Sequence, residues 1–177
     1  MCLPTEHVGA TPQNYLEHAR EINKIAGSAL KLETQNTTRV AAKVSLGLSL
    51  QAAELAGKAM LRALGHSVKQ IRRQHSNHNL FTLLKQVERE LQGSQILALS
   101  PHHHFLLWTP IINGVKFENT IAAYFDLHFA RGASAAPRSY FYPDELVFTG
   151  PVPIESLFVM VEHLIRVASN VVTILEQ

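Results

Sequence analysis

The chain has almost no cysteine and lacks the patterns that mark most cofactor-dependent enzymes. Its one cysteine, Cys2, excludes a disulfide within the chain and fits a reducing compartment, so we expect a cytoplasmic protein. There is no P-loop, no glycine-rich dinucleotide fingerprint and no Ser-His-Asp arrangement. Neither Cys-x-x-Cys nor His-Glu-x-x-His is present. We therefore predict no cofactor and no resident metal ion.

Charge and long hydrophobic runs are also scarce. Charged residues make up 17% of the chain and the formal net charge is +2, which is too small by itself to imply a nucleic-acid partner. No uncharged apolar run of about 18 residues occurs, so we do not expect a membrane-spanning helix. The first residues lack the apolar core of a signal peptide. With 46% hydrophobic residues, the 177 positions can build the core of one domain, which we place over residues 1–177.

Apolar residues recur at helical spacing over residues 39–65. Steps of three and four place one row on a single helix face, and a second row widens that face. The first row is Val40, Val44, Leu48, Ala52, Leu55, Ala59 and Ala63, and the second is Leu46, Leu50, Ala53, Met60 and Leu64. The pattern predicts a helix about 40 Å long, with Thr37 or Thr38 as its cap and Gly65 at its end. A helix this apolar must lie at the centre of a bundle.

Two amphipathic patterns flank the long helix. One begins at Pro12, with Thr11 as the cap and Asn14 in the first turn, and is followed by a predicted polar loop at residues 33–37. The other spans residues 79–92 and directs an apolar row to the core: Leu80, Leu83, Leu84, Val87 and Leu91. Its solvent face is predicted to hold Lys85, Glu88, Arg89 and Glu90.

The second half of the chain is less regular. We predict an irregular insertion over residues 94–117, a helix over residues 117–130, and a last helix that begins near Pro153 and runs almost to the C-terminus. Residues 1–12 are expected to form a loose arm. The fold class predicted from these patterns is an all-α bundle with additional short helices.

A basic, histidine-rich segment follows the long helix and contains Lys69, Arg72, Arg73, His75 and His78. RNA cleavage without a metal ion needs a group that accepts the 2′-hydroxyl proton and a cation that stabilises charge on the phosphate. Histidine titrates near neutral pH, and arginine binds phosphate oxygens in a fork. Arg72, Arg73 and His78 are therefore candidate catalytic residues, with His75 as an alternative acid–base group and Lys69 as a ligand-binding residue.

Two simpler interpretations of this segment stay open. In the first, His78 caps the helix that begins beside it and the arginines form a solvated basic turn. In the second, Lys69 and both arginines bind phosphate without any chemistry.

Three groups of residues share a pattern with one known family. They are Gln51-Ala52-Ala53-Glu54 with Lys58-Ala59, Leu61, Leu64 and Gly65 on the long helix, then His78-Asn79-Leu80, then Arg138-Ser139-Tyr140 before the last helix. These motifs resemble the HEPN domain, a family of helical bundles associated with nucleotides and nucleic acids. The resemblance covers residues 38–92 and, more loosely, residues 130–177.

The resemblance implies an up-and-down four-helix bundle that is usually dimeric. Some family members are metal-independent ribonucleases of toxin–antitoxin or defence systems with an Arg-x(4–6)-His signature. Arg72 and Arg73 both stand at such a spacing from His78. Other members bind nucleotides or accompany nucleotidyltransferases without cutting RNA. A nucleotidyltransferase or an antitoxin is therefore an expected partner protein.

Two further clusters have open interpretations. Arg131, Arg138, Tyr140 and Tyr142 combine cations with aromatic rings that can stack bases, so Arg138 and Tyr140 are candidate ligand-binding residues. The alternative is that these rings pack over the end of the bundle while Arg138 pairs with an acidic group. His102, His103 and His104 can bind a metal ion adventitiously, but built sites spread their ligands along an element.

The leading functional hypothesis is thus a nucleotide- or RNA-interacting bundle, with ribonuclease activity as its catalytic form. The alternative is a non-catalytic dimeric interaction or nucleotide-binding module. We expect a homodimer because the apolar stripes are broad for a single small bundle.

Overall fold

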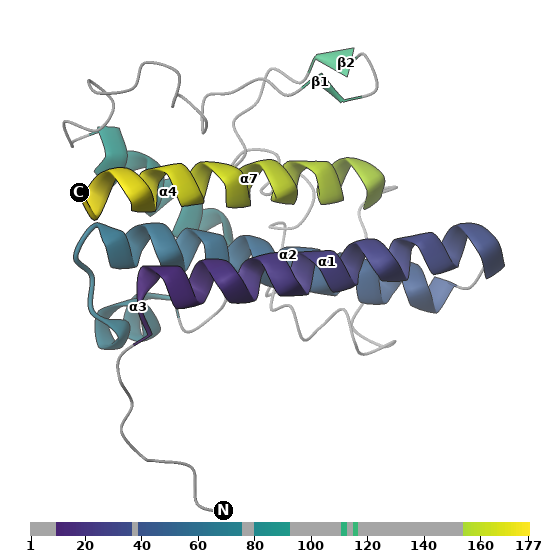
Figure 1. Cartoon of the computed structure of the whole chain (residues 1–177), viewed down its shortest axis with the longest axis horizontal. Helices are drawn as coiled ribbons and strands as arrows, with labels where there is room; N and C mark the ends of the chain where they lie inside the picture. Colours follow the sequence, from purple (N-terminus) through teal and green to yellow (C-terminus); the bar gives the residue numbers. More distant parts are fainter. Residues whose placement is uncertain (1–9, 37–38, 76–79, 93–110, 113–114, 117–153) are drawn as a thin grey trace, which may run out of the picture.

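The computed structural model describes residues 10–36, 39–75, 80–92, 111–112, 115–116 and 154–177 (Figure 1). This part of the chain is a helical bundle, as predicted. Its helices are α1 (Pro12–Asn36), α2 (Arg39–Ala63), α3 (Val68–Gln74), α4 (Leu80–Gln92) and α7 (Ile154–Leu175). Two short strands, β1 (Ile111–Ile112) and β2 (Val115–Lys116), pair antiparallel within the segment predicted to be irregular.

Helix α1 begins where its capping chemistry predicts and ends later than expected. The Asn14 backbone N–H donates to Thr11 Oγ1 at 3.1 Å, and the Thr11 backbone N–H donates to Asn14 Oδ1 at 3.0 Å. The loop predicted over residues 33–37 was wrong for residues 33–36, which continue the helix to Asn36. These positions contain no glycine or proline, and polar composition alone does not stop a helix.

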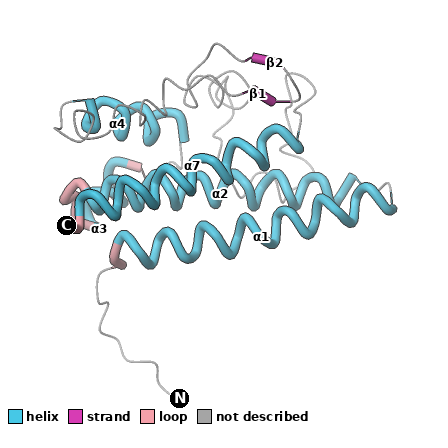
Figure 2. The backbone as a smooth tube through the Cα atoms, turned by 45° about the horizontal axis from the view of Figure 1, so that its top comes forward, coloured by secondary structure: helices cyan, strands magenta, loops and turns pink. Residues whose placement is uncertain are grey.

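Helix α2 is the centre of the bundle, as its two apolar rows predict. It contacts α1, α3, α4 and α7, and Figures 1 and 2 show α1 and α7 lying along it. The row predicted as secondary is the deeper one: Leu46, Leu50, Ala53 and Met60 are all buried. In the first row Leu48 and Leu55 are only partly buried. The side of α2 that packs against its neighbours is therefore centred nearer to the second row than to the first.

The end of α2 is set by Gly65, as predicted. Its φ of 95° lies in the left-handed region, which glycine adopts without steric cost. The Gly65 N–H donates to the Arg62 carbonyl at 3.1 Å, and the His66 N–H donates to the Leu61 carbonyl at 3.0 Å. This pair of bonds is a Schellman motif, which satisfies the last carbonyls of the helix and turns the chain sharply.

Helix α4 packs its predicted apolar row against α2, and all five of its members are buried. The prediction that Glu88 faces solvent was wrong, because its exposed fraction is only 8%. The Lys85 ammonium lies 3.2 Å from the Glu88 carboxylate and remains half exposed. The buried face of α4 is therefore wider than its apolar row and includes Glu88. The Lys85 side chain lies over the Glu88 carboxylate and keeps its own ammonium partly in solvent.

Helix α7 runs antiparallel to α1 and parallel to α2 (Figure 1). The Gln13 amide donates to Glu176 at 3.0 Å, and Arg20 Nη2 donates to Ser169 Oγ at 2.7 Å, so the start of α1 lies beside the end of α7. Residues Leu157–Leu175 are long and apolar enough to cross a membrane by length and composition, and half of them are buried. Their apolar stripe packs against α1 and α2, as in a core helix.

Several expectations lie outside the described residues. They are residues 1–9 of the predicted arm, the caps Thr37 and Thr38, the helix over residues 117–130, and all but the two short strands of the insertion.

Candidate functional site

The basic segment after α2 contains a short helix that the sequence did not predict. Helix α3 begins at a capping box, in which the Gln70 backbone N–H donates to Ser67 Oγ at 3.2 Å. The Gln70 side chain accepts from the Ser67 backbone N–H at 2.7 Å. Ile71, which is only 1% exposed, anchors the helix to the core. The segment is therefore a docked helix and not an open turn.

Three of the predicted site residues share the outer face of α3. Lys69, Arg72 and Arg73 are exposed, and their spacing of three and four residues puts them on one side of the helix. None of the ion pairs within the described ranges involves any of the three. The face therefore presents three positive charges to solvent.

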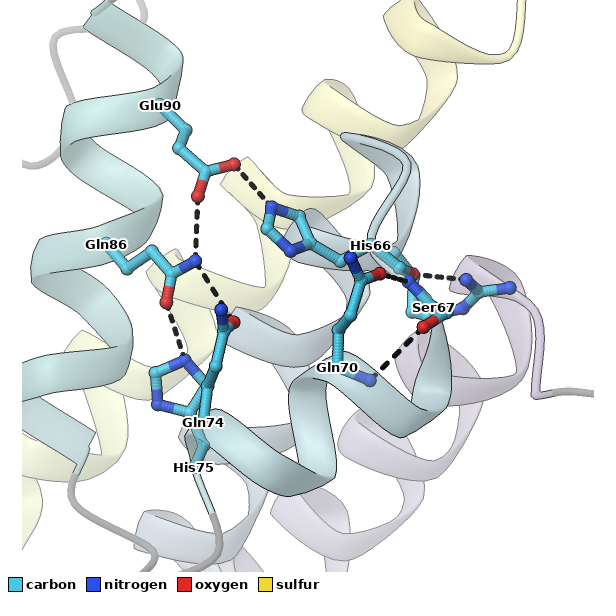
Figure 3. A network of polar contacts seen from close by, with 8 residues as sticks. His66, Ser67, Gln70, Gln74, His75, Gln86 and Glu90 are labelled. Atoms are coloured by element: carbon cyan, nitrogen blue, oxygen red, sulfur yellow. Dashed lines mark hydrogen bonds and ion pairs between the residues drawn. The ribbon is translucent and has the colours of Figure 1, made fainter.

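A chain of hydrogen bonds fastens both ends of α3 to α4 (Figure 3). Before the helix, His66 Nε2 lies 2.6 Å from Glu90 Oε2. After it, His75 Nε2 lies 2.8 Å from Gln86 Oε1. Gln86 Nε2 donates to Glu90 Oε1 at 2.8 Å and completes the chain. We call these four side chains the α3 clamp. It fixes the orientation of the basic face relative to α4.

The clamp determines the proton positions on the histidine ring that follows α3. Because the Gln86 amide nitrogen donates to Glu90, its oxygen accepts, and the proton lies on His75 Nε2. The pKa of His75 is lowered, chiefly by burial, while the hydrogen bond that His75 donates to Gln86 acts in the opposite direction and the Lys58 charge lowers it further. His75 is therefore neutral at pH 7.

The carboxylate of the clamp stays ionised. Burial alone would raise the pKa of Glu90, but the hydrogen bonds with Gln86 and His66 outweigh it and lower the pKa below its ordinary value. Arg89 adds to this lowering through its charge. At neutral pH Glu90 is thus a charged acceptor for two side chains.

Helix α2 also carries a polar pair close to His75. Glu54 and Lys58 stand four residues apart and form an ion pair, with side chains only 7% and 16% exposed. Both charges act on the pKa of His75, in opposite directions. The pair is buried and structural, and it adds little net charge to the site.

The structure separates the predicted site residues into three groups. Lys69, Arg72 and Arg73 are brought together on one exposed face. His75 is only 5% exposed and points into the clamp, so an acid–base role for it stays a prediction. His78, Arg138 and Tyr140 lie outside the described residues, as do Arg131, Tyr142 and the three histidines His102, His103 and His104.

Sequence reasoning did not identify His66, Gln86 and Glu90 as a unit. The i,i+4 spacing of Gln86 and Glu90 places them on one helix face, and Ser67 with Gln70 is a capping-box pattern. The capping-box pattern marks the start of α3, and the Gln86–Glu90 pair marks a polar side of α4 that can face it. Which histidines reach that side depends on the packing of α3.

The clamp is a hydrogen-bonded network without metal-site character. Among the described residues, no group of three or more His, Cys, Asp or Glu side chains gathers closely enough to hold a metal ion. Comparison with protein families, curated proteins and solved structures found no match for this chain.

Proposed function

We propose that this protein binds the phosphate groups of RNA or of a nucleotide on the outer face of α3. The observation that supports the proposal is the grouping of Lys69, Arg72 and Arg73 on one exposed face of a helix that is clamped at both ends. The HEPN-like motifs of the sequence point to the same class of ligand.

The chemistry of the three side chains fits phosphate. A guanidinium binds two phosphate oxygens in a fork, and an ammonium adds a compact positive charge. The helix that carries them is held by a capping box, by Ile71 and by the α3 clamp. A face that is already ordered loses less conformational entropy when a ligand binds.

The catalytic form of the proposal is a metal-independent ribonuclease of the toxin–antitoxin or defence type. In this form His78 accepts the proton of the 2′-hydroxyl, and Arg72 and Arg73 stabilise charge on the phosphate. His75, held inside the clamp, positions α3. A homodimer would supply two such faces, and a nucleotidyltransferase or an antitoxin is the partner protein we propose for this class.

One feature of the structure favours the non-catalytic alternative. Arg72 and Arg73 face open solvent, whereas catalysis needs water-excluded, fixed geometry around the reacting phosphate. A nucleotide- or RNA-binding interaction module needs only the exposed charges.

The test is incubation of the purified full chain with total RNA and with a defined single-stranded RNA, in EDTA. Four proteins are compared: wild type, His78→Ala, the double variant Arg72→Gln/Arg73→Gln, and the control Arg89→Gln on the exposed side of α4. The ribonuclease form predicts cleavage that His78→Ala and the double variant lose and the control keeps. Binding without cleavage, lost only in the double variant, supports the module. A wild-type protein that neither binds nor cleaves RNA, and binds neither ATP nor GTP, contradicts the whole proposal.

A further inference from the structure

A cavity of about 570 Å³ lies between α1 and α7, on elements separate from the basic face of α3. Its size is within the range of small-molecule sites. The residues that define its chemistry are Arg20, Asn23, Lys24, Phe158 and Glu162.

Asn23 gives this cavity a buried hydrogen-bond acceptor. Its exposed fraction is 5%, and its Oδ1 atom has no hydrogen-bond partner among the described residues. Buried side-chain polar atoms nearly always have a partner, so one that lines a cavity is suited to a donor group on a bound molecule. An Asn that served only the packing of α1 would be better replaced by an apolar residue of its size.

The mouth of the cavity is basic. Arg20 and Lys24 are exposed on α1 one turn apart, and Glu162 on α7 is the acidic residue of the lining. The Arg20 guanidinium is oriented by its hydrogen bond to Ser169 at 2.7 Å. The excess of positive charge selects an anion, and the oriented guanidinium suits a carboxylate.

The wall of the cavity is apolar and aromatic. Phe158 is partly buried, and its ring packs so tightly on α1 that a Cβ atom at Gly27 would lie 2.9 Å from it. Leu30 and Ile165 complete this wall. An aromatic wall of this kind favours a flat ring that stacks on it or meets its edge.

We propose that this cavity binds a small aromatic carboxylate that carries a hydroxyl or amino group. The carboxylate lies at Arg20 and Lys24, the ring lies against Phe158, and the donor group reaches Asn23 Oδ1. The site is independent of phosphate binding by α3, so either proposal can fail without the other.

The test uses 4-hydroxybenzoate as the probe, titrated into the full chain by isothermal calorimetry. Benzoate lacks the donor, phenol lacks the charge, and inorganic phosphate lacks the ring. We expect 4-hydroxybenzoate to bind at least tenfold more tightly than each of the three. Equal binding of benzoate, tighter binding of phosphate, or no binding of the probe at millimolar concentration would overturn the proposal.

Two variants locate the site. Asn23→Leu is expected to reduce probe affinity at least tenfold while the melting temperature stays level or rises. Gly27→Ala is expected to weaken binding because its new methyl displaces the Phe158 ring. The matched control is Asn170→Leu, which changes an exposed Asn of α7 and should leave affinity unchanged. Undiminished probe binding in Asn23→Leu would refute the assignment, whatever its melting temperature.

Discussion

Replacing Arg72 and Arg73 with glutamine should change how RNA binding depends on salt more sharply than it changes the fold. Both side chains are exposed and lie outside the α3 clamp, so glutamine removes charge without removing packing. Each phosphate neutralised on a single strand contributes about −0.7 to the slope of log K against log salt concentration. Three contacts from the α3 face therefore give a slope of about −2.1, and the Lys69 contact that remains in the double variant gives about −0.7.

These slopes translate into measurable affinities. Between 50 and 200 mM salt the wild-type affinity for single-stranded RNA should fall about 18-fold, and that of the double variant only about 2.6-fold. Fluorescence anisotropy of a labelled RNA across a KCl series measures both slopes directly. Circular dichroism of the double variant checks that the helices are intact.

The control for this experiment is Arg89→Gln, which removes one exposed positive charge from α4. It should keep the wild-type slope because Arg89 is not on the α3 face. Equal slopes in wild type and double variant would refute the reasoning, since the two arginines would then make no phosphate contact. A reduced slope in the control would show that binding is spread over the surface.

The remaining predictions concern stability, measured by urea denaturation. Glu54→Ala should lower the free energy of unfolding by about 3–5 kcal/mol because it leaves the Lys58 charge buried without its carboxylate. The double variant Glu54→Leu/Lys58→Met should recover most of that loss, and an equal loss in both proteins would contradict the ion-pair account. Gly57→Ala should cost about 1–3 kcal/mol because its Cβ atom would lie 2.9 Å from Leu83 Cδ2, where α2 and α4 meet; an unchanged urea midpoint would show that α4 shifts freely. The lowered pKa of His75 means that below pH 6.5 the unfolded chain takes up a proton that the folded chain resists, so stability should fall as the pH drops from 6.5. His75→Gln should reduce this dependence on pH, and a wild-type slope in that variant would assign it to other groups.

Local chemistry explains the predictions that were confirmed. The Thr11–Asn14 cap and the glycine end of α2 depend on residues a few positions apart, which a sequence shows directly. The apolar rows of α2 and α4 could also be predicted, because helical spacing shows which residues share one side of a helix. The α3 helix was missed because seven residues are too few for a periodic pattern and its Ser67–Gln70 cap was not recognised.

Long-range packing explains the burial of Glu88, which was predicted to face solvent, and the contacts that were not foreseen. Which side of α2 is buried depends on where α1, α4 and α7 pack around it, and so does the burial of Glu88. Spacing cannot show this, since several rotations of a broadly apolar helix bury nearly the same area.

The sequence by itself determined that the bundle is helical and where most of its helices begin and end. It also placed Lys69, Arg72 and Arg73 within one short basic segment. Only the tertiary structure decided that His75 points inward, that His66 and His75 meet Glu90 and Gln86, and that Asn23 lines a cavity beside Phe158. The physical reason is the distance along the chain between the residues that interact. Capping and periodicity act within one helix, whereas the burial and pairing of a polar side chain depend on residues that another helix brings to it.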